Sequence, residues 1–146
     1  MNSVENAKNG IQLLLEKYAR DYHNHDLDGI MSDWSNDEDV ILYGTDANEK
    51  RIGWAPIREQ FARNFTEAEN LVFEWKWTDI NANGQVAWLA ADAIVSVTVK
   101  DQKSELAIRF TAIFEQRNGR WYWVQRHSSA PATAQSGGQG LSCTDS

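Results

Sequence analysis

The sequence contains a single cysteine, Cys143, which lies near its end. One cysteine cannot form a disulfide within the chain, and this fits a reducing compartment. Long apolar runs are also absent, since the longest, residues 86–91, has six residues, whereas a membrane span needs about 20. No apolar stretch follows the N-terminus as a secretory signal requires. We therefore expect a cytoplasmic protein that does not insert into membranes.

Basic residues are outnumbered by acidic ones. Fourteen Lys and Arg against 21 Asp and Glu give a formal net charge of -7 and a pI near 4.9. Binding to nucleic acid draws much of its affinity from clustered cations that neutralise phosphates. A chain without a basic tract is therefore not expected to bind nucleic acid, nor to adsorb to anionic membranes.

The length of 146 residues and the mass of 16.6 kDa suit one domain. Hydrophobic residues make up 42% and charged residues 24%, which is typical of a globular protein and excludes a wholly disordered chain. Tryptophan is abundant, with seven copies. Because such side chains bury large areas and line cavities, their positions are candidates for a core or a pocket.

The first half of the chain has helical periodicity. Apolar residues recur at intervals of three and four over residues 4–22, which predicts an amphipathic helix. A short second helix is expected at 27–34 and a short strand at 40–43. After a loop at 44–51, a third helix carries Trp54, Ile57, Phe61 and Phe65 on one stripe, with Pro56 tolerated in its first turn.

From residue 71 the period becomes that of strands. We expect long strands at 71–80, 85–99, 104–116 and 120–127, with turns at Asn83-Gly84, at 100–103 and at Asn118-Gly119. Strands joined by short loops pair antiparallel. The prediction is therefore an α+β fold in which three helices pack on an antiparallel sheet of four long strands. The domain covers residues 1–131, and residues 132–146 form a low-complexity tail.

Both faces of this sheet are apolar. Around residues 104–116, Ile108 and Phe110 point one way, while Thr111 and Ile113 point the other way with Arg109. Three helices can cover one face only, and a contiguous apolar patch seldom stays exposed on a monomer. We therefore expect self-association, as a dimer or a larger oligomer, through the convex face. The alternative is a sheet that curls tightly and covers itself.

Two local strings resemble a known superfamily. Residues 53–61 (GWAPIREQF) resemble the glycine-then-helix segment of the nuclear transport factor 2-like superfamily. Residues 114–131, which contain NGRW and HSSAP, are closest to the SnoaL-like domains and to the association domain of calcium/calmodulin-dependent protein kinase II. The resemblance covers residues 4–131. It implies a cone-shaped, cystatin-like roll with a pocket at the open end. The superfamily includes enzymes, carriers and assembly domains, so the fold alone does not define the function.

The superfamily's functional positions match only in part. In ketosteroid isomerases a tyrosine on the first helix and two acids lie in the pocket. Tyr18 matches the tyrosine, but the general-base position falls near Leu42 or Tyr43 and the second acid near Thr111. Because proton abstraction needs a base within reach, this activity is not expected. The arginines that receive carboxylates in the kinase association domain align with three non-basic residues: Asp92, Ala112 and Ser128.

Three residues are candidates for proton transfer. Asp92 interrupts an apolar stretch, so it either pairs with a cation, Arg109 or Arg126, or has a raised pKa and acts as an acid or base. The first alternative is an inter-strand salt bridge with a structural role. His127 ends the last predicted strand and either relays protons or ties down the final loop. Tyr18 completes the set.

The ligand-binding candidates are mainly aromatic. The residues expected to line the cavity are Trp34, Tyr43, Trp54, Trp75, Trp77 and Trp88, together with Arg109 and Arg126. The register of the last hairpin stays open. A two-residue turn would set His127 opposite Phe110, and a three-residue loop with a bulge would set it opposite Arg109. This choice decides whether Arg126 or His127 faces the pocket.

No cofactor or metal site is predicted. His23, His25, Asp26 and Asp28 cluster after the first helix, but exposed polar residues in a helix–helix turn explain them equally well. The preferred interpretation is a small-molecule-binding SnoaL-like domain that acts as a cofactor-free isomerase, cyclase or dehydratase through Asp92, His127 and Tyr18. Two alternatives are a non-catalytic oligomerisation domain that resembles the kinase association domain, and a carrier for an apolar ligand.

Overall fold

A computed structural model describes residues 3–132. Within this range three helices precede a sheet: α1 (Ser3–His23), α2 (Leu27–Met31) and α3 (Trp54–Glu67). The six strands are β1 (Ile41–Tyr43), β2 (Lys50–Ile52), β3 (Asn70–Asn83), β4 (Val86–Val99), β5 (Gln102–Arg117) and β6 (Arg120–Ser129). The three predicted helices are present, although α2 is three residues shorter than expected. The predicted tail falls almost wholly outside the described residues.

The sheet is larger than predicted. Its strand order is β2-β1-β6-β5-β4-β3, so six strands pair instead of four. The expected meander of β3 to β6 is antiparallel, but β1 pairs parallel with β6 and makes the sheet mixed. β2 lies at the end of the predicted loop and pairs antiparallel with β1. The sequence gives only a weak signal for these two pairings, because β1 and β2 have three residues each and β1 pairs with a strand far along the chain.

Two β-bulges interrupt the long strands. In β3, Trp75 pairs with Ala93 and Trp77 with Asp92, so Lys76 between them is an extra residue. In β6, Trp123 pairs with Phe114 and Gln125 with Ile113, so Val124 is extra. A bulge bends its strand and exchanges the faces of all residues beyond it.

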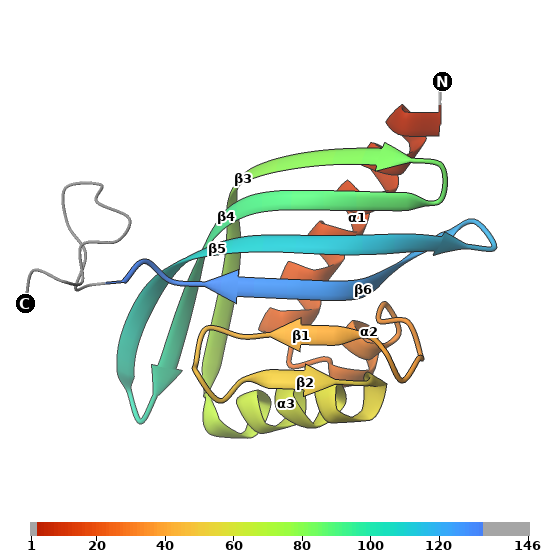
Figure 1. Cartoon of the computed structure of the whole chain (residues 1–146). Coiled ribbons are helices and arrows are strands. Elements are labelled where there is room, and N and C mark those ends of the chain that lie inside the picture. The colour runs from red at the N-terminus through yellow and green to blue at the C-terminus, as the bar shows by residue number, and fades with distance from the viewer. Residues whose placement is uncertain (1–2, 133–146) are drawn as a thin grey trace, which may run out of the picture.

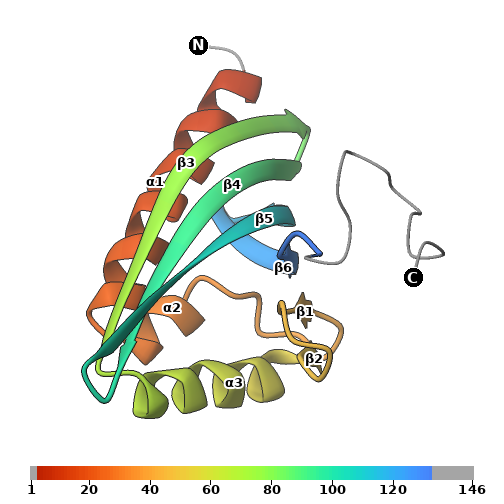
Figure 2. The ribbon, with the colours of Figure 1, turned by 90° about the vertical axis from the view of Figure 1, so that its left-hand side faces the viewer.

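The helices cover one face of the curved sheet, which we call the inner face; the opposite face is the outer face. In Figure 1 α1 runs behind the long strands, and in both views strands β3 to β5 bend down toward α3 (Figures 1 and 2). Side chains alternate as predicted along β5: Ile108, Phe110 and Phe114 are buried, whereas Arg109 and Thr111 are exposed. The inner face and the helices share one hydrophobic core.

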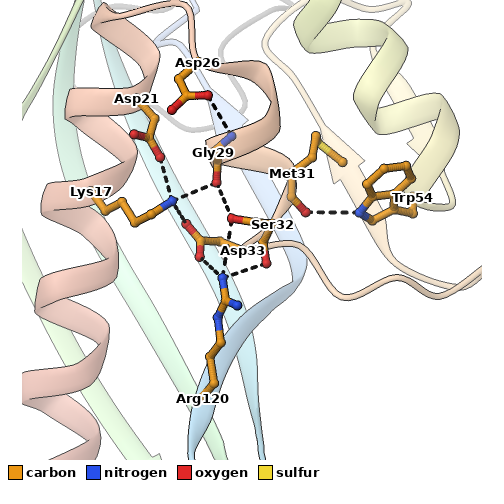
Figure 3. A network of polar contacts seen from close by, with 9 residues as sticks. All are labelled: Lys17, Asp21, Asp26, Gly29, Met31, Ser32, Asp33, Trp54 and Arg120. Carbon is orange, nitrogen blue, oxygen red and sulfur yellow. Dashed lines mark hydrogen bonds and ion pairs between the residues drawn. The ribbon is translucent and has the colours of Figure 1, made fainter.

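A polar network connects α1 and α2 to the start of β6 (Figure 3). Lys17 Nζ donates to Asp21 Oδ2 at 2.7 Å, Asp33 Oδ2 at 2.9 Å and Gly29 O at 2.8 Å. Arg120 Nη2 donates to the other oxygen of Asp33 at 2.9 Å. Burial works to lower the pKa of Lys17, but the two carboxylates raise it on balance. The network fixes the segment after α2, where Trp34 makes a parallel bridge to Trp123.

In the described part of the chain, no helix is long and apolar enough to cross a membrane.

Candidate functional site

A cavity of about 140 Å³ lies on the inner face. Its walls come from α1, α3, β1, the segment between β1 and β2, and the four long strands. The residues that line it are Tyr18, Tyr22, Leu42, Gly44, Thr45, Glu49, Gln60, Phe61, Asn64, Phe73, Val95, Leu106, Ile108, Phe110, Arg126 and Ser128. A dry cavity of about 150 Å³ accepts benzene in another protein, so this one has room for a small organic molecule.

Arg126 is the cation of this cavity. It comes from β6 beyond the bulge and is 7% exposed. Its guanidinium carbon lies 4.8 Å from the ring centroids of both Tyr18 and Phe110, 5.2 Å from that of Phe61, and 5.4 Å from that of Trp123. Aromatic faces attract a cation and partly replace its lost hydration. The rings therefore hold the guanidinium against the cavity wall.

The charge of Arg126 has no counter-ion among residues 3–132. No salt bridge involves it there, and its Nε and Nη1 atoms are buried without a hydrogen-bond partner in that range. An arginine stays protonated at any physiological pH. Because an unpaired buried charge is costly, and Arg126 lines the cavity, an anion from solution is the natural partner.

Polar groups from α3 and the β1–β2 segment form a second part of the wall. Gln60 Nε2 donates to Glu49 Oε2 at 3.0 Å and to Asn64 Oδ1 at 3.1 Å. The backbone N–H of Asp46 donates to Glu49 Oε1 at 3.0 Å. Gln60 is 5% exposed, and its Oε1 has no partner among the described residues. Two residues of the cavity lining, Arg126 and Gln60, thus have buried polar atoms without a partner in the described range.

Two tyrosines of α1 line the same space. Burial raises the pKa of Tyr18, and the positive charge of Arg126 opposes this rise without cancelling it. Burial also raises the pKa of Tyr22, with further contributions from Tyr18 and Glu49. Both phenols are therefore neutral at physiological pH and act there as hydrogen-bonding groups.

Of the predicted site residues, Tyr18 and Arg126 line the cavity. Trp34 is fully buried behind Arg126, with its ring centroid 5.8 Å from the guanidinium carbon, and its Nε1 has no partner in the described range. Trp75 and Trp54 have structural contacts, because their indole N–H groups donate to the carbonyl oxygens of Leu15 and Met31.

The other predicted site residues lie on the outer face. Trp77 is 54% exposed and Trp88 is 46% exposed. Asp92 is exposed and sits directly across from Arg109 on β5, but no ion pair joins them in the described chain. The expected burial of Asp92 is thus corrected, since the apolar residues around it belong to both faces of β4. Tyr18, Asp92 and His127 do not meet in one site.

His127 also lies outside. It is exposed, and its ring packs 5.2 Å from that of Tyr43, which is itself 43% exposed. Neither of the two predicted registers is present, because His127 pairs with Thr111. The turn at Asn118-Gly119 has two residues as in the first alternative, but the bulge at Val124 moves the register by one. This shift places Arg126, and not His127, on the inner face.

The polar cluster after α1 has structural contacts. His23 Nδ1 lies 2.8 Å from Leu71 O, and the ring of His25 stacks on Phe65 at 5.0 Å. Asp26 caps α2 by accepting a hydrogen bond from Gly29 N at 2.9 Å. No group of three potential metal ligands forms within residues 3–132.

Sequence reasoning did not select Gln60 or Glu49. A signal for Gln60 was present, because a polar residue at 60 falls on the apolar stripe of α3 between Ile57 and Phe61. A glutamine on a buried stripe needs hydrogen-bond partners. Glu49 gave no comparable signal, since it lies in a polar segment whose course depends on the unforeseen pairing of β1 and β2.

Comparison with known proteins places the chain in a family. The family model described as SnoaL-like domain matches residues 11–133, and the chain therefore belongs to this family within the nuclear transport factor 2-like superfamily. The match confirms the resemblance seen in the sequence. No curated protein matches the chain.

Solved structures share the fold at low identity. One from Xanthomonas campestris, provisionally named a calcium/calmodulin-dependent protein kinase II association domain, is 21% identical with a TM-score of 0.74 over 84% of this chain and 86% of that one. A nuclear transport factor 2-like protein of unknown function from Pseudomonas putida is 19% identical with a TM-score of 0.75, covering 86% and 87%. A protein from Streptomyces avermitilis, provisionally named a dehydratase, is 11% identical with a TM-score of 0.77, covering 86% and 97%. At these identities the likeness establishes the cystatin-like α+β fold alone.

Proposed function

We propose that this chain binds a small organic carboxylate in the inner-face cavity, with Arg126 as the anion receptor. The observation that carries the proposal is the buried guanidinium of Arg126, which has no counter-ion among the described residues and two nitrogens without hydrogen-bond partners. Hydrogen bonds between a guanidinium and a carboxylate are charge-assisted and stronger than neutral ones. The surrounding rings favour a ligand whose remaining atoms are apolar or aromatic.

The proposal differs from the anion site of the kinase association domain that the sequence alignment considered. The three aligned positions hold no arginine here, and Arg126 approaches the cavity from a different position on β6. An anion-binding function is thus supported by this chain's own geometry and not by alignment with that domain.

Proton transfer, as in an isomerase, cyclase or dehydratase, would use other residues than the predicted trio. Asp92 and His127 lie on the outer face, whereas Glu49 and Tyr18 line the cavity. Glu49 is the carboxylate among the lining residues and would serve as the base. Tyr18 stays neutral because burial raises its pKa, so it would donate a hydrogen bond to a developing negative charge. The dehydratase name of the Streptomyces avermitilis protein is compatible with such chemistry.

Isothermal titration calorimetry with benzoate, and with the shorter propionate, tests the binding proposal. We expect the wild type to bind at least one of them and Arg126→Met to bind it at least about tenfold more weakly, because charge-assisted hydrogen bonds are lost. Arg109→Met is the matched control on the neighbouring strand's outer face and should bind like the wild type. Circular dichroism checks that both variants are folded. No binding to the wild type, or equal binding by Arg126→Met, would contradict the proposal.

A second function, self-association, is favoured by the outer face. Its large exposed apolar side chains include Trp77, Trp88 and Ile113. A hollow of about 310 Å³ lies there beside Trp88, Ile113 and His127. We propose that a second copy of the chain covers this surface. Sedimentation equilibrium should show a dimer or a larger oligomer for the wild type and monomers for Trp88→Glu, since burying the new charge is costly. A monomeric wild type would contradict this.

A further inference from the structure

The side-chain amide of Gln60 has a fixed orientation. Its nitrogen carries two hydrogens, and both are used, one by a carboxylate oxygen of Glu49 and one by the side-chain oxygen of Asn64. Rotating the amide by 180° would point its oxygen at two acceptors. The amide oxygen, Oε1, therefore points away from both partners, and it has no donor within residues 3–132.

This oxygen belongs to a buried side chain of the cavity wall. Gln60 is 5% exposed and lines the same space as Arg126. Buried polar atoms nearly always have a hydrogen-bond partner, and an exception points to an unseen group. A carboxylate bound at Arg126 cannot supply it, because an ionised carboxylate is an acceptor only. A ligand that satisfies both walls must carry a donor as well.

The charge near Gln60 strengthens this requirement. Glu49 contacts Gln60 directly, lines the cavity, and has no cation partner in the described chain. Its negative charge repels a second carboxylate and attracts an N–H or O–H dipole. Phe73, Ile108 and Phe110 also line the cavity and offer no hydrogen bonds. The lining of the cavity therefore combines a cation, hydrogen-bond acceptors and apolar side chains.

We infer that the ligand is a small monocarboxylate with an apolar or aromatic body and a separate hydroxyl or amino group, whose hydrogen bond Gln60 Oε1 accepts. This inference rests on the proposed function, because it places the carboxylate at Arg126. It excludes dicarboxylates of similar size as good ligands. Gln60 is then the residue that determines specificity.

Matched pairs of probes test the inference by calorimetry. The pairs are 4-hydroxybenzoate with 4-methylbenzoate and 3-hydroxybenzoate with 3-methylbenzoate, so that a methyl group replaces the hydroxyl at equal size. We expect the hydroxyl compound of at least one pair to bind about tenfold more tightly to the wild type. Benzene-1,4-dicarboxylate should bind more weakly than either 4-substituted compound.

Two variants test whether Gln60 causes the preference for the hydroxyl compounds. Gln60→Met keeps the length of the side chain but removes its oxygen, and it should bind both members of a pair with equal affinity. Gln125→Met, on the outer face of β6, is the control and should keep the preference. If the four compounds bind in an Arg126-dependent way without a hydroxyl preference, or if the preference survives in Gln60→Met, the inference is overturned and the proposed function stands. If none of them binds to the wild type, both are overturned.

Discussion

Arg109 and Arg126 lie on neighbouring strands of the same sheet but have opposite environments. Arg109 is on the outer face and exposed to solvent, whereas Arg126 is on the inner face, 7% exposed and surrounded by aromatic rings. A solvated arginine interacts weakly with a passing anion, because water screens its charge. A desolvated arginine interacts strongly. The comparison teaches that chemistry in this fold depends on the face that a residue occupies more than on its type.

The face of Arg126 is determined by one extra residue. Trp121 and Trp123 are buried, and strict alternation would bury Gln125 and His127 after them. The bulge at Val124 shifts the alternation so that Arg126 and Ser128 point inward instead. The bulge at Lys76 acts in the same way on β3, where it sends Trp77 to the outer face.

Deleting Val124 should have the largest effect. Without the extra residue, either Arg126 leaves the cavity and His127 becomes buried, or the pairing with β5 breaks. We expect the free energy of unfolding to fall by about 3 kcal/mol or more, in the range of severe core defects, and benzoate binding to disappear. Urea denaturation measures the first effect and calorimetry the second.

Val124→Ala is the control for the deletion, because it keeps the residue count and therefore the register. Val124 is only half-buried, so this variant should lose about 1 kcal/mol or less and should keep its ligand. A deletion variant that is as stable as the wild type and still binds benzoate would show that the bulge does not determine the face of Arg126.

The buried tyrosines should produce an intermediate effect at alkaline pH. Their pKa values are raised in the folded chain, so the unfolded chain releases its protons first as the pH rises. The stabilisation is fully present below pH ~10, the ordinary tyrosine pKa, and is lost as the pH rises through the folded values. Each tyrosine contributes a slope of up to about 1.4 kcal/mol per pH unit.

The double variant Tyr18→Phe, Tyr22→Phe should therefore lose stability less steeply above pH ~10 than the wild type. Tyr43→Phe is the outer-face control, since Tyr43 is 43% exposed, and it should keep the wild-type slope. Urea denaturation at a series of pH values between 8 and ~11 measures the slopes. Equal slopes for the wild type and the double variant would contradict the burial of these phenols.

Substitutions of the polar outer-face residues should have the smallest effect. Asp92→Asn and His127→Gln change exposed side chains that lie away from the cavity. We expect stability to change by about 0.5 kcal/mol or less and benzoate affinity to stay within about twofold. Calorimetry and thermal denaturation of both variants provide the check. A loss of binding in either one would assign a role at the ligand site to the outer face.

The elements that follow from local pattern were predictable. The three helices, the long strands and the alternation along β4 and β5 arise from periodicity and turn residues close in sequence. The pairs β1–β2 and β1–β6 were not predictable, because a three-residue strand has too few side chains to show a period. Their partners are also chosen by the tertiary fold.

The orientation of a site residue could be predicted from the sequence only where no bulge precedes it in its strand or helix. Tyr18 lies on a regular helix, so its inward position follows from the apolar stripe of α1. Trp77 and His127 come after bulges, and an inserted residue that exchanges faces leaves no clear mark in the sequence. Arg126 was among the predicted ligand-binding residues, but the register of the last hairpin was left open between two alternatives. The structure places Arg126 on the inner face by a third register that neither alternative contained.

The most direct test of the inner-face receptor follows the side-chain Nε–H resonances of the arginines by NMR during a benzoate titration. The Arg126 signal is assigned from its loss in Arg126→Met, and the Arg109 signal from its loss in Arg109→Met. We predict that the Arg126 resonance shifts and saturates with the calorimetric affinity while the Arg109 resonance stays in place. A titration that moves Arg109 and leaves Arg126 unchanged would contradict the account.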